Sequence, residues 1–390
     1  MSTDIKNKKI YEERKGSGKR LTTILAITVI TVLTAAVIML VIKRSGIREE
    51  QTILNSIPGV AAQAETLPVP RGAEDDAADD PAIWINYSNP DSSRIIGTDK
   101  KGGLAVYDLS GNQLFYYPDG LMNNADIRYG FVLNEDTIDI MAVSNRTDNT
   151  ISLYRINKTG SLDKIHKRQI ISELEDEVYG LCMYKSPVSG LFYVFMNNKF
   201  GVIEQWELFQ DADKIDGKIV RKLKVPTQVE GMTADDEMAV LYVGEEDTGI
   251  WKFRAEPDAT AEGALIPKSG EKDNEYIKYD IEGMAVFALQ DGTGYLVVSS
   301  QGNDTYAVFR REGENEYLGS FRITDGTVDG VQITDGLDVT SHPLGTLFPA
   351  GLMVAQDGTN MEGDKQAAQN FKLIKWESIA SLFSPALLLK

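Results

Sequence analysis

The chain has 390 residues, enough for two average domains or one large all-β domain, and it carries 58 acidic against 40 basic residues. The formal net charge of −18 argues against nucleic acid as a partner, because nucleic-acid binding relies on basic surfaces. A single cysteine excludes an intrachain disulfide, and only two histidines disfavour zinc, copper or nickel sites. The excess of carboxylates fits either a solvated acidic surface or a supply of oxygen ligands for cations.

The N-terminal segment predicts a membrane anchor. Residues 21–42 contain no charged side chain and are long enough, as a helix, to cross a hydrocarbon layer of ~30 Å. Basic residues are more numerous before this run than after it, so residues 1–20 are expected in the cytoplasm and the remainder outside the cell. Residues 43–64 are then an extracellular tether of a single-pass protein of the cell membrane. The alternative is a secreted protein whose leader is cleaved, but the small-residue pattern at residues 62–64 lies far beyond the apolar run.

Short apolar runs that alternate with turn residues fill the chain from residue 65 to residue 390. The runs are rich in Val, Ile, Tyr, Phe and Leu, which is typical of strands. Those that fit strands best are Ile95–Gly97, Leu104–Tyr107, Ile138–Ser144, Ile151–Ile156, Phe192–Met196, Val202–Glu207, Val240–Val243, Ile250–Phe253, Tyr295–Ser299 and Tyr306–Arg310. A helical period is expected only over Trp376–Phe383 within this part of the chain.

A repeat organises these strands. Six times, at intervals of about 50 residues, a polar residue stands before or within an apolar stretch, and a polar hairpin turn and a further strand follow. We counted the repeat through Asp80, Asp126, Tyr179, Glu230, Glu282 and Asp335. Several short strands per repeat predict an all-β fold, a β-propeller that occupies residues 65–390 as one domain. Radial repetition would gather the equivalent loops of all six repeats around one axis.

The residues at these loops differ in charge. The segments before the strands supply many carboxylates, among them Asp79, Glu230, Glu282 and Asp335, and carboxylates packed around one axis favour bound cations. Oxygen donors without histidine or cysteine suit Ca²⁺. The hairpin turns add Lys100, Lys101, Arg146 and Lys199. Each of these could be an ordinary surface charge and calcium could be purely structural, but acids and cations together suit a multiply charged anion such as a phosphate ester.

Several of these motifs closely resemble the β-propeller phytases, the calcium-dependent alkaline phytases typified by bacilli. The similarity extends over about residues 64–385. The matching stretches are residues 76–84, 96–107, 123–130, 144–148, 177–180, 245–247, 299–303 and 368–372. The resemblance implies a six-bladed propeller, preceded here by the predicted transmembrane helix.

The resemblance also implies an activity. A phosphoric monoester hydrolase of the 3-phytase type would hydrolyse phytate, or its calcium salt, to lower inositol phosphates with water activated by calcium at the channel mouth. The implied catalytic set is Lys100, Lys101, Arg146, Tyr179, Lys199, Glu230 and Asp335. The implied ligands of active-site calcium are Asp79, Glu230, Glu246, Asp280, Glu282 and Asp335, and those of structural calcium are Glu65, Asp80, Gln301 and Asp329.

Two positions depart from the family pattern. Phe200 stands where the family usually has an acid after the lysine, and Ile333 stands where it has an acid two residues before Asp335. The alternatives to an enzyme of this kind are a non-catalytic, calcium-stabilised propeller that acts as a binding module, and a propeller esterase or lactonase with one calcium. Because neither alternative requires four cations beside the acids, we expect the phytase activity. We also expect the protein to be a monomer.

Overall fold

The computed structural model describes the backbone of residues 2–390 and all their side chains except those of residues 16–27, 29, 30, 45, 47 and 49. The chain divides into two compact units, Met1–Ser56 and Ile57–Lys390. The first unit is one helix, α1 (Ser2–Ser56). Apolar side chains of its second half are exposed, including Leu33, Met39 and Ile42.

The predicted membrane span falls within α1. Among the side chains that the structure describes, no helix presents a stretch that is long and apolar enough to cross a membrane. Residues 21–27, 29 and 30 of the predicted span lie outside the described side chains, so the span over residues 21–42 stays a prediction. The predicted tether over residues 43–64 differs from the structure, because α1 continues to Ser56 and the residues beyond it join the second unit.

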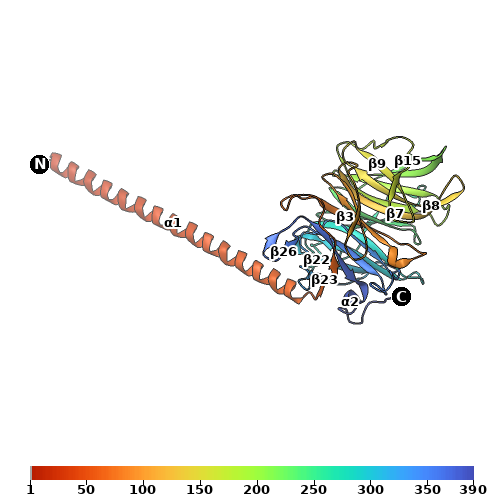
Figure 1. Ribbon diagram of the computed structural model, residues 1–390. Coiled ribbons are helices and arrows are strands. Elements are labelled where there is room, and N and C mark those ends of the chain that lie inside the picture. The colour runs from red at the N-terminus through yellow and green to blue at the C-terminus, as the bar shows by residue number, and fades with distance from the viewer. Residues whose placement is uncertain (1) are drawn as a thin grey trace. The chain divides into compact units, whose positions relative to one another are not determined.

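The second unit is a β-propeller of six sheets (Figure 1). Blade one contains β3 (Ala78–Trp84), β4 (Arg94–Asp99), β5 (Gly103–Tyr107) and β6 (Gln113–Tyr117). Blade two contains β7 (Met122–Leu133), β8 (Asp136–Asn145), β9 (Thr150–Ile156) and β10 (Leu162–Lys164), with β11 (Ile170–Ile171) also paired to β9. Blade three contains β12 (Val178–Lys185), β13 (Phe192–Asn198), β14 (Val202–Asp211) and β15 (Lys214–Lys224).

The last three blades follow the same antiparallel order. Blade four contains β16 (Val229–Asp235), β17 (Val240–Glu245), β18 (Gly249–Arg254) and β19 (Ala264–Leu265). Blade five contains β20 (Ile281–Ala288), β21 (Gly294–Ser300), β22 (Thr305–Arg310) and β23 (Tyr317–Thr324), and blade six contains β24 (Leu337–Thr340), β25 (Leu352–Asp357) and β28 (Asn370–Lys375). Outside the blades lie a small hairpin, β26 (Met361–Glu362) with β27 (Lys365–Gln366), the 3-10 turns η1 (Pro90–Ser92) and η2 (Gln301–Asn303), and helix α2 (Trp376–Ala380).

Two short N-terminal strands close the ring. β1 (Gly59–Ala61) pairs in parallel with β23 of blade five, and β2 (Ala64–Glu65) pairs with β28 as the fourth strand of blade six. The innermost strands pack against one another in sequence, and β24 packs against β3. The predicted all-β propeller with six repeats is therefore confirmed, as are the predicted strands and the start of the C-terminal helix, although α2 ends at Ala380 rather than at Phe383. The predicted start of the domain at residue 65 leaves out β1 and the first residue of β2, which lie in the segment predicted to be a tether.

A bulge gives the inner strands their repeated motif. The strand pairing shifts register within β3, β7, β12, β16 and β20, at the second and third residues of each strand. In blades three to five the second of these residues is glycine, and Gly336 stands at the equivalent place before β24. A Cβ atom at Gly180 would lie 1.8 Å from the carbonyl oxygen of Glu230, and one at Gly231 would lie 2.1 Å from that of Glu282. The acid–glycine pairs seen in the sequence thus allow adjacent inner strands to approach closely.

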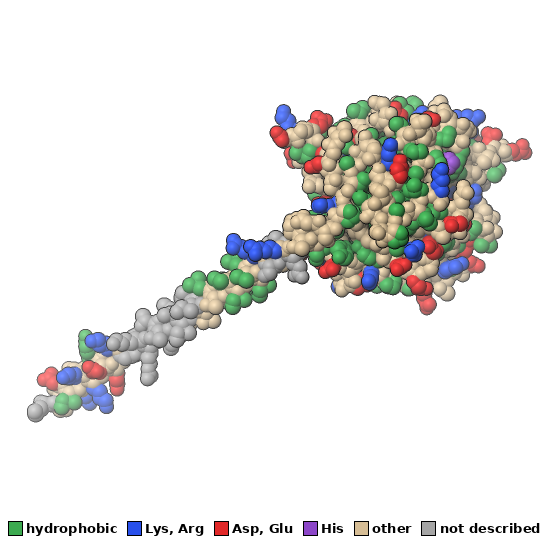
Figure 2. All heavy atoms as spheres, turned by 90° about the horizontal axis from the view of Figure 1, so that it is seen from below, with side chains coloured by type: hydrophobic (Ala, Val, Ile, Leu, Met, Phe, Trp, Pro, Cys, Tyr) green, Lys and Arg blue, Asp and Glu red, His purple; other side chains and the backbone are tan. Residues whose placement is uncertain are grey.

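The inner strands line a central cavity of about 360 Å³. We call the end of this channel at which the inner strands begin the mouth. Because neighbouring strands are antiparallel, the hairpin turns between the second and third strands of the blades also lie at the mouth. Apolar side chains fill the spaces between blades, as where Phe287 stacks on Trp376 with ring centroids 3.8 Å apart. Charged side chains of both signs are scattered over the surface that Figure 2 shows.

Candidate active site

The first bulge residue of each inner strand, or its equivalent before β24, points to the mouth. These six residues are Asp79, Asn123, Tyr179, Glu230, Glu282 and Asp335. Five of them belong to the predicted site. The hairpin turns add further predicted residues, which are Lys100, Arg146, Lys199, Glu246 and Gln301. Sheet pairing therefore brings together side chains that lie far apart in the sequence.

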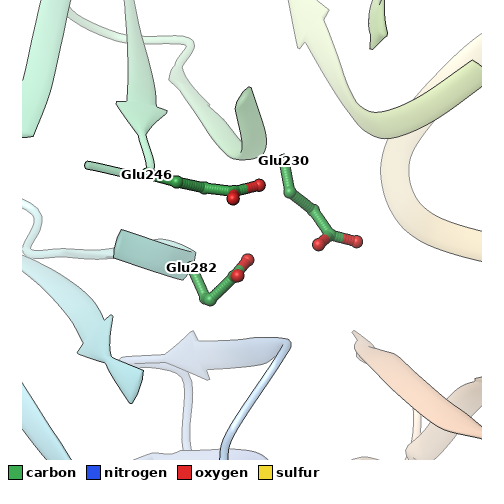
Figure 3. A group of neighbouring side chains, drawn as sticks. All are labelled: Glu230, Glu246 and Glu282. Carbon is green, nitrogen blue, oxygen red and sulfur yellow. The ribbon is translucent and has the colours of Figure 1, made fainter. Parts of the chain in front are cut away.

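Three glutamates form the centre of this cluster (Figure 3). Glu230, Glu246 and Glu282 each offer one carboxylate oxygen, and these oxygens all lie within 4.8 Å of one another. Glu230 and Glu282 are 5% exposed, and Oε2 of Glu282 has no hydrogen-bond partner although it is buried. A buried carboxylate oxygen without a partner beside two like charges is costly unless a cation neutralises it.

The protonation equilibria reflect this crowding. Burial raises the pKa of Glu230 to about 7 and the pKa of Glu246 to about 7. Burial also raises the pKa of Glu282 well above its usual value, and the neighbouring Glu230 and Asp335 add to this shift. The three carboxylates thus resist carrying their full negative charge together unless positive charge enters the site.

Lys100 joins the carboxylates of two blades. Its Nζ atom lies 3.1 Å from Asp79, 2.8 Å from Asp335 and 2.9 Å from the exposed Asp76. Although burial disfavours the charged ammonium, Asp79 and Asp335 hold the pKa of Lys100 above its usual value. Asp335 also accepts a hydrogen bond of 2.8 Å from Nε2 of Gln301. Lys100 is therefore positively charged and is held at the edge of the carboxylate cluster.

On the opposite side of the mouth from Lys100, two cations lie near the ring of Tyr179. Nζ of Lys199 lies 4.4 Å from the ring centroid, and Cζ of Arg146 lies 6.0 Å from it. Arg146 donates hydrogen bonds to Glu177 at 2.5 Å and to Asn123 at 3.0 Å. No ion pair of Lys199 with a carboxylate is seen among the described residues. Burial, together with Glu230 and Glu282, raises the pKa of Tyr179, so its hydroxyl stays protonated.

Two predicted residues, Lys101 and Asp280, lie at the edge of the site. Lys101 has an exposed side chain on the turn next to Lys100, with no hydrogen bond or ion pair among the described residues. Asp280 immediately precedes β20, and its charge contributes to the raised pKa of Glu246. Both residues lie next to members of the cluster in the chain, and neither contributes one of the three closely spaced oxygens.

Asp80 lies in the channel, beyond the mouth. It lines the cavity, and its Oδ2 atom accepts a hydrogen bond of 3.0 Å from the amide of Ala125. The repeat position assigned to Asp126 also belongs to the channel, where Asp126 lies 2.8 Å from Nη1 of Arg128. Arg128 donates a further hydrogen bond of 2.6 Å to the carbonyl of Met183 in blade three. These side chains join neighbouring blades inside the channel.

Glu65 and Asp329 surround a lysine. The fully buried ammonium of Lys372 donates to Glu65 at 2.5 Å and to Asp329, and it lies 3.2 Å from Asp357. The structure thus separates the residues predicted as structural calcium ligands: Gln301 is at the mouth, Asp80 is in the channel, and the other two are beside Lys372. The sequence analysis did not single out Lys372 as their partner.

The two departures from the family pattern are both exposed. Phe200 is 56% exposed on the turn that carries Lys199, and Ile333 is 53% exposed two residues before Asp335. Ile333 has a φ angle of 52°, a left-handed conformation that a β-branched residue rarely adopts. At these two positions the chain has apolar side chains on the rim in place of carboxylates.

Sequence reasoning missed some residues of the site. Asn123, whose side chain is fully buried, contacts both Glu230 and Arg146, and Glu177 is paired with Arg146. Asn123 and Glu177 both lie in stretches that carried the family resemblance, but neither was assigned a role. An alignment of the six repeats on the bulge rather than on the acids would have found Asn123.

The residues at the mouth fit a calcium ion. Calcium prefers several oxygen ligands, and carboxylates are the oxygen donors with the highest charge. The glutamate cluster offers such oxygens with one left unpartnered, and there is no histidine or cysteine among the three residues. The fold and the mouth together define a six-bladed β-propeller whose site suits a cation and a multiply charged anion side by side.

Comparison with known proteins identifies the family. The family described as Phytase matches residues 23–389. The 3-phytase of Bacillus subtilis (strain 168) is 45% identical over 328 residues, which cover 82% of this chain and 84% of that protein. The chain therefore belongs to the phytase family, as its motifs indicated. Among solved structures, BBS1N in its complex with ARL6DN matches 80% of this chain and 97% of the BBS1N chain. The TM-score of 0.45 and the identity of 9% are too low to inform function.

Proposed function

We propose that the protein is a calcium-dependent phytase that hydrolyses phytate, myo-inositol hexakisphosphate, to lower inositol phosphates and inorganic phosphate. The observation that carries the calcium dependence is the unpartnered Glu282 oxygen within the cluster of three buried glutamates. Phosphate-binding cations on the adjacent turns, and the activity in the name of the similar Bacillus subtilis protein, support phytate as the substrate. The 3-phytase type of phosphoric monoester hydrolysis is proposed on the same basis.

Glu230, Glu246 and Glu282 would hold calcium at the mouth, with Asp79, Asp280 and Asp335 as further carboxylates nearby. Calcium, when bound there, would supply positive charge against the phosphoryl oxygens and activate water. The three glutamates would then carry their full negative charge, because the cation offsets the repulsion that raises their pKa values. Of the four residues predicted as structural calcium ligands, Gln301 would orient Asp335. Asp80 lies in the channel, and Glu65 and Asp329 already have the ammonium of Lys372 as their cation, so these three are given no part in the reaction.

The four cations at the mouth would interact with the phosphates of the substrate in different ways. Arg146 presents a planar guanidinium whose Nε atom is buried without a hydrogen-bond partner, and Lys199 has no carboxylate partner among the described residues. Lys199 is therefore available to phosphate oxygens, and the partly exposed guanidinium of Arg146, held by Glu177 and Asn123, would present its charge to the same phosphate. Lys100, held between Asp79 and Asp335, would bring positive charge to the phosphate that lies nearest the carboxylates. The exposed Lys101 would attract the polyanionic substrate to the rim.

The alternative is a non-catalytic propeller in which calcium only stabilises the fold. Arg146→Ala and Lys199→Ala distinguish the two functions, because neither residue lies in a blade core. For the enzyme, both changes abolish phosphate release from phytate and leave the melting temperature almost unchanged. Wild-type turnover in both variants would show that the phosphate-binding assignment is wrong. No turnover by the parent protein, with a calcium-dependent rise in its melting temperature, would favour the binding module.

The enzyme is also proposed to be anchored in the cell membrane, with the propeller outside the cell. Residues 21–42 lack charge, and the described apolar side chains at the end of this run are exposed, as Val37, Leu40 and Ile42 illustrate. Fractionation of cells that produce the full chain tests this. An anchored protein stays with membranes after an alkaline wash and is cut from them by external protease. Release of a shorter protein into the medium would favour the alternative of a cleaved, secreted form.

A further inference from the structure

Asn123 occupies a position in the ring at which four of the other five residues are aspartate or glutamate. The equivalent residues in blades one, four, five and six are Asp79, Glu230, Glu282 and Asp335, and the fifth is Tyr179. Asn123 has no solvent exposure and no formal charge. An amide at this position can do what a carboxylate cannot, because it donates hydrogen bonds as well as accepting them.

The amide joins the two halves of the site. Its Nδ2 atom donates a hydrogen bond of 2.6 Å to Oε1 of Glu230 and lies 3.4 Å from Oδ1 of Asp79. Its Oδ1 atom accepts a hydrogen bond of 3.0 Å from Nη1 of Arg146. One side chain therefore contacts two carboxylates of the acidic half and the guanidinium of the phosphate-binding half.

The chemistry of these partners fixes the orientation of the amide. If the amide were turned over, its oxygen would face the carboxylates of Glu230 and Asp79, and its NH₂ group would face the guanidinium of Arg146. Both contacts would then be repulsive, because carboxylates only accept hydrogen bonds and guanidinium groups only donate them. Nδ2 also donates a hydrogen bond of 2.8 Å to Asn124, which further restrains the group.

Other buried polar side chains around the ring bond to backbone atoms. Asn197 accepts from the amide of Gly180 and donates to the carbonyl of Glu230, and the hydroxyl of Ser144 donates to the carbonyl of Tyr179. Gln356 accepts from the amide of Asp335. These contacts hold adjacent blades together. Asn123 differs from these three residues because it bonds to side chains of the proposed reaction, and unlike Gln301 it contacts both a carboxylate and a phosphate-binding cation.

We propose that Asn123 is a positioning residue that holds the Glu230 carboxylate and the Arg146 guanidinium in one arrangement, so that the cation and a substrate phosphate bind in register. This inference rests on the proposed phytase function. Without the amide, Glu230 loses a donor and Arg146 loses an acceptor, so Arg146 is held only by Glu177 and both side chains can shift from this arrangement. Loss of a positioning hydrogen bond of this kind typically lowers activity about 10–100-fold.

The test compares three variants of the full chain. Asn123→Leu removes both functions of the amide. Asn123→Asp keeps the acceptor for Arg146 and loses the donor to Glu230. Asn315→Asp is a control, because Asn315 is equally buried and its Nδ2 atom donates to Tyr242 and to two carbonyls in a turn of blade five, at the end of the blade away from the mouth. For each variant, kcat and KM for phytate are measured at saturating calcium, with the melting temperature.

We expect the two Asn123 variants and the control to differ in kcat, KM and melting temperature. In Asn123→Leu, kcat falls about 10–100-fold and KM rises. In Asn123→Asp, KM returns toward the parent value because Arg146 keeps its acceptor, while kcat stays low. Asn315→Asp lowers the melting temperature and leaves kcat unchanged. If both Asn123 variants keep kcat within about twofold of the parent, or if the control loses kcat equally, the inference is wrong, because the effect is then absent or merely structural. Failure of the parent itself to turn over phytate would instead refute the proposed function.

Discussion

Two of the carboxylate clusters in the propeller differ in whether a side chain of the protein lies between the acids. At the mouth, Glu230, Glu246 and Glu282 face one another without a protein cation between them. Beside β2 and β28, three carboxylates surround Lys372, the ammonium of which is fully buried. The second cluster has its cation supplied by the chain. In our proposal, a calcium ion supplies the positive charge for the first cluster, where substrate would also bind.

The two clusters serve different purposes. The mouth cluster belongs to the proposed active site, and the Lys372 cluster helps to close the ring of blades. The Lys372 cluster joins residues from β2, from the loop before β24 and from β25 and β28 of blade six, so it fastens β2 to the last blade. Among the described residues, no lysine or arginine lies between the three mouth glutamates, and their mutual repulsion adds to the raised pKa of Glu282. Removal of a carboxylate from the mouth cluster should therefore stabilise the calcium-free protein, whereas removal of the lysine from the Lys372 cluster should destabilise it.

Glu282→Gln should have the largest effect on activity. The change removes one of three closely spaced carboxylates, so phosphate release from phytate is expected to fall about 10²–10³-fold. The same change relieves like-charge repulsion, so the melting temperature in chelator should rise rather than fall. Initial rates and thermal unfolding, each with calcium and with chelator, check both parts. A variant that loses stability in chelator would show that the cluster is already compensated without calcium.

Lys372→Met should have the largest effect on stability. It leaves Asp329 and Asp357 buried without their cation, and breaking a buried ion pair in this way costs about 3–5 kcal/mol. Urea unfolding of the parent and the variant measures this free energy. Because Lys372 lies outside the mouth, the folded fraction of the variant should keep the kcat of the parent. A loss of kcat at full folding would mean that the two clusters are coupled.

The stability of the calcium-free protein should depend on pH in an unusual direction. Burial raises the pKa of Glu230 to about 7 and the pKa of Glu246 to about 7, above the 4.5 of an unfolded glutamate. Between these values the folded state binds more protons than the unfolded state, so stability falls as pH rises. In chelator, we expect the melting temperature to drop by a few degrees between about pH 5 and pH 8. Calcium should flatten this dependence; an equal slope with calcium would exclude the glutamates as its source.

Ile333→Asn should have a small and favourable effect. Ile333 has a φ angle of 52°, where asparagine is tolerated far better than a β-branched residue. The change should stabilise the protein by about 0.5–1 kcal/mol, with a gain that is equal in calcium and in chelator. A gain seen only in calcium would mean that the new amide oxygen serves as a ligand. Denaturant unfolding in both conditions, with Phe200→Asn as a rim substitution that relieves no strain, makes the distinction.

The sequence was most informative where a repeat has a local signature. The acid–glycine pairs at Glu230 and Glu282 mark the bulge, and the pair at Asp335 marks its equivalent before β24, because a Cβ atom at these glycines would clash with the adjacent inner strand. In blades one and two the second bulge residue is Asp80 or Asn124 rather than glycine. The count therefore slipped to Asp80 and Asp126, although Asp79 was still assigned to the site. The slip explains why Asn123 was overlooked.

The remaining surprises come from contacts between distant segments. No local pattern shows that residues 59–61 and 64–65 pair with blades five and six, because that pairing depends on closure of the whole ring. The burial of Lys372 depends in the same way on carboxylates that are contributed by three separate segments. The individual residues Glu65 and Asp329 were identified as important, but their common partner could be found only in three dimensions.

The most direct test of the account is the rate of phosphate release from sodium phytate by the full chain as free calcium is varied, from chelator to about 1–5 mM. The account predicts almost no release in chelator and a saturable rise with calcium, because the mouth glutamates depend on an external cation. Release that is equally fast in chelator would contradict it, since the unpartnered carboxylates would then have no need of calcium.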